Sequence, residues 1–217
     1  MNRTITVKGT GKVSTKPDQV VLSMTLETTH KEYDQAMKIA ADHIQQLNME
    51  LCGIGFEKSD LKTTSFDVDT EYGYVKIRNE SERVFQGYKV MHRMKLTFDF
   101  DMQRLSQTLS AIAGCLAHPQ LSIDFTIKDT TAINEELLRS AAINAKKQAV
   151  VLCDAAGVTM GELITIDYNW GELDVYSHTR YDCCEEALDI PTFMAPVEIE
   201  PEDIKVSDTA TFMWEIE

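Results

Sequence analysis

The chain has 217 residues, with 35 acidic against 21 basic side chains and a formal net charge of −14. This charge argues against nucleic acids and anionic membrane surfaces as partners, because proteins that bind them carry basic stripes. The longest basic cluster is Lys146-Lys147. Hydrophobic residues make up 43% of the chain, which is enough for a buried core, and no apolar run reaches membrane-spanning length. We expect a globular protein with no nucleic-acid partner and no membrane span.

Two alternating β runs open the chain. Gly9-Thr10-Gly11 interrupts the first run, and Pro17-Asp18 leads into the second. We interpret the glycines as a β-bulge and the Pro-Asp pair as a corner. A phosphate-binding loop is disfavoured because a strand, not a helix, follows the glycines. The first strand starts without a charged and apolar leader, which predicts a cytoplasmic protein.

Period-2 alternation predicts the second of these strands and five more. Each has one apolar and one polar face, which is typical of antiparallel sheets with one face in water. The expected strands span 18–28, 61–75, 84–100, 121–127, 163–168 and 206–216.

Three segments, 31–51, 101–116 and 131–156, repeat apolar residues at helical spacing. Gly53 and Gly55 are suited to ending the first helix. Helices and a sheet that each have one apolar face bury those faces by packing against each other. We therefore predict a single α+β domain over 1–217, with a mainly antiparallel sheet and three helices packed on one face.

Residues 169–203 show no sustained period and include three prolines. An irregular segment of this length is usually functional or disordered. Its large apolar residues need a burial site. They are Trp170, Leu173, Val175, Tyr176, Tyr181, Leu188, Ile190, Phe193 and Met194. We expect the segment to cross between protomers or cover a shared surface, with folding back on its own sheet as the alternative.

The five cysteines are an odd number and form no disulfide framework in this prediction. Cys52, Cys115 and Cys153 stand singly in helical or apolar contexts, where cysteine behaves as a small buried hydrophobe. Cys183-Cys184 lack the two-residue spacer of a zinc site, so His178 nearby is not taken as a ligand. A reducing cytoplasm fits this cysteine usage best.

The sequence contains none of the common catalytic motifs. His92 falls on the apolar side of its strand, and we interpret it as a hydrogen-bonded histidine at the sheet margin. Asp67, Asp69 and Glu71 alternate on one side of another strand, where solvated carboxylates are favoured over a divalent-cation site. The same interpretation applies to the loop acids, which are Glu185, Glu186 and Asp189. We predict no catalytic, cofactor-binding or metal-binding residues.

Four segments together resemble the SIMPL domain family over nearly the whole chain. They are Val7-x-Gly9-x-Gly11-x-Val13 with Pro17-Asp18, Gly55-x4-Asp60-Leu61-x-Thr63, Ala141-x3-Ala145 with Ala156-Gly157-Val158-x2-Gly161, and Ile199-x-Pro201. The family is named after a mammalian adaptor associated with a pelle-like kinase and includes a bacterial periplasmic immunogenic protein. The resemblance implies an α+β fold that can assemble into rings. It brings no catalytic residues with it.

We therefore expect a non-enzymatic bacterial protein that acts through self-assembly or partner binding, as a homo-oligomer and without a cofactor. One alternative is a hydrolase or isomerase whose acid–base groups come from loops, such as His118, His178 and the carboxylates of 169–203. Another alternative is a signalling adaptor, which rests on analogy with the family name.

Overall fold

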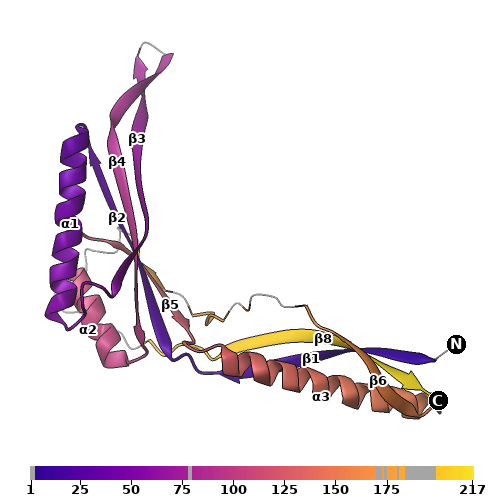
Figure 1. The fold of residues 1–217 in the computed structure, drawn as a ribbon. Helices are drawn as coiled ribbons and strands as arrows, with labels where there is room; N and C mark the ends of the chain where they lie inside the picture. The colour runs from indigo at the N-terminus through magenta and orange to yellow at the C-terminus, as the bar shows by residue number, and fades with distance from the viewer. Residues whose placement is uncertain (1–2, 78–79, 170–172, 174, 180, 184–198) are drawn as a thin grey trace. The chain divides into compact units, whose positions relative to one another are not determined.

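The computed structural model describes residues 3–77, 80–169, 173, 175–179, 181–183 and 199–217 (Figure 1). Its elements in chain order are β1 (Thr4–Thr15), β2 (Gln19–His30), α1 (Tyr33–Gly53), β3 (Leu61–Ile77), β4 (Glu80–Asp99), α2 (Met102–Ala113), β5 (Gln120–Thr126), α3 (Thr131–Ala156), β6 (Met160–Asp167), β7 (Tyr181–Cys183) and β8 (Ile204–Ile216). The α+β class and the antiparallel pairing are confirmed, and the strands divide between two sheets.

The chain forms two compact units. Unit 1 comprises 1–17, 126–178 and 201–217, and unit 2 comprises 18–125 and 179–200. Each unit contains one sheet, with β1-β8-β6 in unit 1 and β3-β4-β2-β5-β7 in unit 2. The sequence predicts one domain over 1–217. That the two units fold together as one domain stays a prediction.

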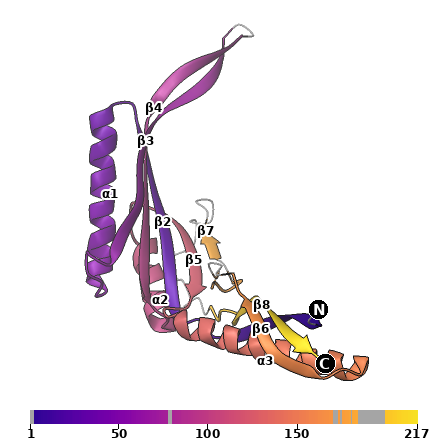
Figure 2. The ribbon, with the colours of Figure 1, turned by 45° about the vertical axis from the view of Figure 1, so that its right-hand side comes forward.

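Unit 1 packs α3 along its three-stranded sheet (Figure 2). The helix buries a residue at every fourth position, which lays one narrow stripe against the strands. The stripe consists of Ile133, Leu137, Ala141, Ala145, Ala149 and Cys153. Its alanines meet Val7 of β1 and the stacked rings of Phe212 and Trp214 on β8, whose centroids are 5.7 Å apart. Small side chains on the helix let its backbone come close to the sheet.

The predicted bulge at Gly9 and Gly11 is wrong. β1 pairs with β8 in unbroken register from Thr4 to Thr15, so neither glycine distorts the strand. A Cβ atom on Gly9 would overlap the carbonyl oxygen of Ala141, and one on Gly11 would overlap that of Leu137. The two glycines are therefore required by the close approach of α3 and not by a bulge.

Unit 2 places α1 and α2 against its five-stranded sheet. The core side chains come from the strands and from both helices. They include Leu22, Met24, Leu47, Leu96, Leu105 and Phe125, all almost fully buried. Beyond the start of α1, β3 and β4 continue as a two-stranded arm (Figures 1 and 2).

The described part of the predicted excursion folds back on its own chain. Val175 is buried and packs, with Leu173, among residues of α3 and β8. Thr126 Oγ1 donates a hydrogen bond to the Val175 carbonyl at 2.6 Å, and Ser177 Oγ donates to the Glu202 carbonyl at 2.8 Å. Trp170, Leu188, Ile190, Phe193 and Met194 lie outside the described residues. An intersubunit role for that remainder stays a prediction.

Among the helices that the structure describes, none is both long enough and apolar enough to cross a membrane.

Candidate functional site

His92 is hydrogen-bonded, as predicted. Its Nε2 atom lies 2.8 Å from Thr63 Oγ1, and its ring meets the edge of Phe66 at 5.1 Å between centroids. Its strand, β4, is an inner strand, so the predicted position at the sheet margin is wrong. Partial burial lowers the pKa of His92 below its ordinary value, because the charged imidazolium loses hydration there. These contacts anchor β3 to β4, and burial disfavours the charged form of His92.

We expect this histidine to make stability depend on pH. The unfolded chain takes up the proton near pH 6.5, whereas the folded chain resists it to a lower pH. The unfolded state therefore binds more protons in that interval, and the free energy of unfolding falls as the pH is lowered through it. Urea unfolding between pH 7.5 and 5 measures the slope. His92→Gln is expected to flatten it, and exposed His118→Gln is the control. Equal slopes in all three proteins would contradict the assignment.

The predicted row of carboxylates on β3 faces basic residues on β4. The row consists of Asp67, Asp69 and Glu71. Arg93 Nη1 lies 3.1 Å from Asp67 Oδ2, and Lys89 Nζ lies 2.5 Å from Glu27 Oε1 on β2. The hydrogen bond that Lys89 donates to the Glu27 carboxylate raises the pKa of Lys89, and the charges of Glu27, Glu71 and Asp69 add to this effect. Over the part of the chain that the structure describes, no cluster of metal-binding side chains forms. The open face of this sheet is thus a ladder of opposite charges.

The two histidines of the loop-based enzyme alternative belong to different units. His118 is exposed between α2 and β5, and His178 is exposed in unit 1. Among the carboxylates of the excursion, the loop acids Glu185, Glu186 and Asp189 fall outside the described residues, whereas Glu200, Glu202 and Asp203 lie within them.

Two of the three single cysteines are buried, as predicted. Cys115 and Cys153 lie in the cores, whereas Cys52 is exposed, so the prediction for Cys52 is wrong. Cys52 directly follows buried Leu51 on α1 and therefore falls off the apolar stripe of that helix. Cys183 belongs to the backbone of β7, and Cys184 lies outside the described residues.

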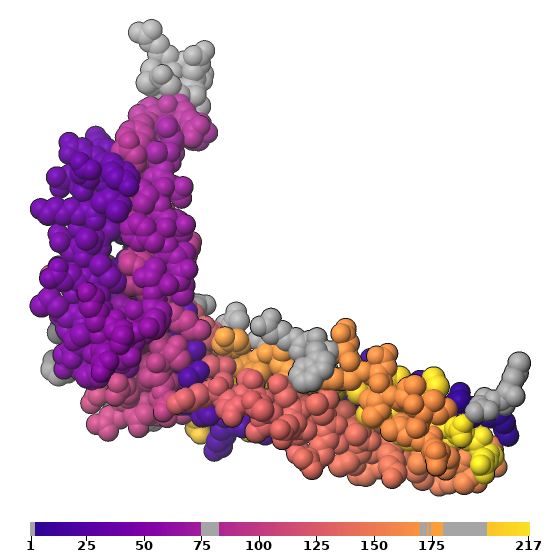
Figure 3. All heavy atoms as spheres, viewed as in Figure 1, coloured from indigo at the N-terminus to yellow at the C-terminus, as the bar shows by residue number. Residues whose placement is uncertain are grey.

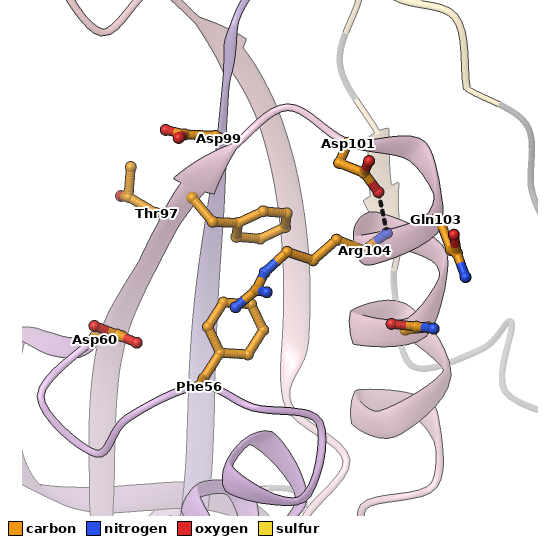
Figure 4. A pocket seen from close by; sticks show the side chains of 9 residues that line it. Phe56, Asp60, Thr97, Asp99, Asp101, Gln103 and Arg104 are labelled. Carbon is orange, nitrogen blue, oxygen red and sulfur yellow. Dashed lines mark hydrogen bonds between the residues drawn. The ribbon is translucent and has the colours of Figure 1, made fainter.

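A pocket of about 600 Å³ opens in unit 2 between α2 and the end of β4 (Figure 4). Its lining is Phe56, Asp60, Thr97, Phe98, Asp99, Asp101, Gln103, Arg104 and Gln107. The Arg104 guanidinium stacks on Phe56, 4.2 Å from the ring centroid. Asp101 Oδ1 accepts from the Arg104 backbone N–H at 2.7 Å and caps α2, and Asp60 Oδ2 accepts from Glu57 N–H at 2.9 Å. Two of the three carboxylates thus hold local backbone, and neither His118 nor His178 lines the pocket.

The arm of β3 and β4 carries a series of aromatic rings, of which Tyr72 and Phe85 are exposed and Tyr88 is half-buried. Tyr33 at the start of α1 meets Tyr88 edge to face, Tyr88 meets Phe85, and Phe85 meets Tyr72, with centroids 5.4 to 5.7 Å apart. Arg83 lies 3.9 Å above the Tyr72 ring. In Figure 3 the arm extends past the start of α1. Sequence periodicity missed this surface, because it arises from pairs far apart along the chain.

β6 forms an edge of the three-stranded sheet, where it pairs with β8 alone. Three of its large apolar side chains are exposed, namely Leu163 at 47%, Ile164 at 44% and Ile166 at 58%. α3 lies mainly over β1 and β8 and leaves the helix-facing side of β6 uncovered. An edge strand with open backbone groups and apolar side chains is a template for pairing with another chain.

These features describe an α+β protein with an exposed edge strand, an aromatic arm and a pocket beside α2. The chain belongs to the SIMPL family, described as a protein of unknown function (DUF541), whose model matches residues 5–214. The resemblance drawn from the sequence motifs is thereby confirmed.

Two curated relatives are 26 kDa periplasmic immunogenic proteins, from Brucella abortus (strain S19) and Brucella melitensis biotype 1. Each is 23% identical to this chain over 163 residues, which is 75% of this chain and 65% of the relative. The chain thus spans less than two thirds of the length of these relatives.

Proposed function

We propose that this protein acts by binding polypeptide chains, above all further copies of itself, and not by catalysing a reaction. The observation that supports this proposal is the exposed β6 edge with Leu163, Ile164 and Ile166. Each such side chain contributes about 1.5 to 3 kcal/mol when it is fully buried, so covering them together favours association. The unpaired backbone N–H and C=O groups of an edge strand favour a strand as the partner, because only another strand forms hydrogen bonds with one group after the next.

The test replaces Leu163 and Ile166 with glutamate, since both lie on the helix-facing side of β6, which α3 leaves uncovered. We expect the wild-type protein to be oligomeric at micromolar concentration and the double variant to have the mass of a folded monomer, by light scattering after gel filtration. Leu116→Glu is the matched control, because Leu116 is 79% exposed in unit 2. A strictly monomeric wild-type protein, or a double variant with unchanged mass and intact circular dichroism, would contradict the proposal.

The cellular compartment of this protein, and any partner other than a further copy of itself, are also matters of proposal. The cysteine usage supports a cytoplasmic location, whereas the names of the Brucella relatives place those proteins in the periplasm. A signalling-adaptor role rests on the family name alone.

A further inference from the structure

The β6 edge has a counterpart at the other edge of the same sheet. The strand order β1-β8-β6 leaves β1 as the second edge. The Ile216 N–H donates to the Arg3 carbonyl at 3.0 Å, so the odd-numbered residues of β1 turn their backbone groups toward β8. Thr10 therefore turns its backbone groups outward, where its carbonyl accepts a hydrogen bond from the Asn144 side chain of α3 at 2.8 Å. Since backbone direction alternates along an edge strand, the even-numbered residues of β1 share this outward direction. A carbonyl oxygen accepts two hydrogen bonds, so Asn144 does not close this edge.

The two edges carry opposite charges on the same face of the sheet. Lys8 and Lys12 are exposed and alternate with the two glycines that touch α3, so they face away from the helix. On β6, Asp167 pairs with Thr211, which is also the partner of Lys8. Asp167 therefore lies on that same open face.

Glu162 also lies on the open face. Met160 pairs with Ile216 and Leu163 with Trp214, so Gly161 and Glu162 together stand against Glu215. Glu215 adjoins buried Trp214 and so faces away from α3.

The spacing of the charges matches between the two edges. Lys8 and Lys12 pair with Thr211 and Ser207, four ladder positions apart on β8. Asp167 stands against Thr211 and Glu162 against Glu215, and these positions are also four apart. β6 reaches this spacing with five residues because its irregular register inserts extra residues.

We infer that the partner of the β6 edge is the β1 edge of a second copy, so that the three-stranded sheet continues from one protomer to the next. β1 and β6 both run antiparallel to β8 and hence parallel to each other. A repeated identical step therefore sets β6 parallel to the next β1. Because Lys8 and Asp167 both stand at the level of Thr211 in one protomer, a displacement of each copy by four residues along the strands places Glu162 beside the partner's Lys8 and Asp167 beside the partner's Lys12. Such a head-to-tail contact closes into a ring or extends as a filament. This inference rests on the proposed function.

Lysine on an edge strand also has a protective role, since charged side chains discourage unwanted pairing. The two roles make different predictions about charge reversal. If the two lysines only prevent unwanted pairing, acidic residues at 8 and 12 would leave the oligomer unchanged. If the two lysines pair with the partner's β6, acidic residues at 8 and 12 would face Glu162 and Asp167 and repel them, because like charges placed together across an interface cost several kcal/mol.

The experiment uses two charge-reversal variants of the full chain. One variant carries Lys8→Glu and Lys12→Glu, and the other carries Glu162→Lys and Asp167→Lys. We expect each alone to raise the Kd for self-association about tenfold or more, measured by sedimentation velocity. Mixed in equal amounts, the two should assemble again, because each edge then meets an opposite charge. The quadruple variant should assemble alone. Lys146→Glu with Lys147→Glu is the control, since it changes the net charge as much as the first variant does.

The outcomes separate this inference from the proposed function. A monomeric wild-type protein would overturn both. Dissociation by Leu163→Glu with Ile166→Glu, but not by reversal of either charged pair, would leave the proposed function standing and overturn the pairing of β6 with β1. Dissociation by both charge variants without recovery on mixing would also overturn it.

Discussion

Replacing Gly11 with alanine is expected to lower the free energy of unfolding of unit 1 by about 3 kcal/mol, at the upper end of the usual cost of overpacking. The new Cβ atom would overlap the carbonyl oxygen of Leu137, which belongs to the helix backbone. A flexible side chain could turn aside, but a helical carbonyl moves only with α3, whose stripe of small residues is already closely packed on β1. The added methyl group therefore has to displace the helix.

Gly53→Ala is the matched control for this change. It introduces the same methyl group in the last turn of α1, where an added Cβ atom meets nothing within 4 Å. Alanine also favours helix over glycine, so we expect no loss of stability. Urea unfolding in a Trp170→Phe background, followed by the fluorescence of Trp214, measures both variants, because Trp214 is buried in unit 1. Equal effects of the two substitutions would contradict the close approach of α3 to β1.

Local periodicity predicted the elements well. The apolar stripe of α3, the alternation of β2 and the hydrogen-bonded state of His92 are each determined by residues near one another along the chain or by one residue type in one environment. Such features need no knowledge of what packs against them.

The features that sequence reasoning missed depend on residues far apart along the chain. The reason for Gly9 and Gly11 lies in α3, more than a hundred residues later, and a glycine in a strand reads equally well as a bulge. Local sequence patterns do not reveal the division into two sheets either. Only Lys16-Pro17-Asp18 separates β1 from β2, and yet the two strands pair in different sheets. The aromatic arm and the pocket beside Arg104 likewise form from segments that only the fold brings together.

The second large effect is expected in unit 2, at Phe125. This side chain is fully buried, and its ring meets Phe100 edge to face, with centroids 5.7 Å apart. Phe125→Ala is expected to lower the free energy of unfolding by about 3 to 5 kcal/mol, because it removes apolar contacts and leaves a cavity that the surrounding strands and helices fill only in part. Leu116→Ala, at a side chain that is 79% exposed, is the control and is expected to change little.

The same variant tests whether the two units fold as one domain. In a Trp170→Phe background the fluorescence comes from Trp214 of unit 1 alone, whereas Phe125 belongs to unit 2. Tryptophan fluorescence therefore reports unit 1, and far-ultraviolet circular dichroism reports both units. If the chain is one cooperative domain, as the sequence predicts, Phe125→Ala shifts the urea midpoints of both signals equally. If the units unfold independently, the fluorescence midpoint stays in place while the circular dichroism splits into two transitions, and the single-domain prediction is wrong.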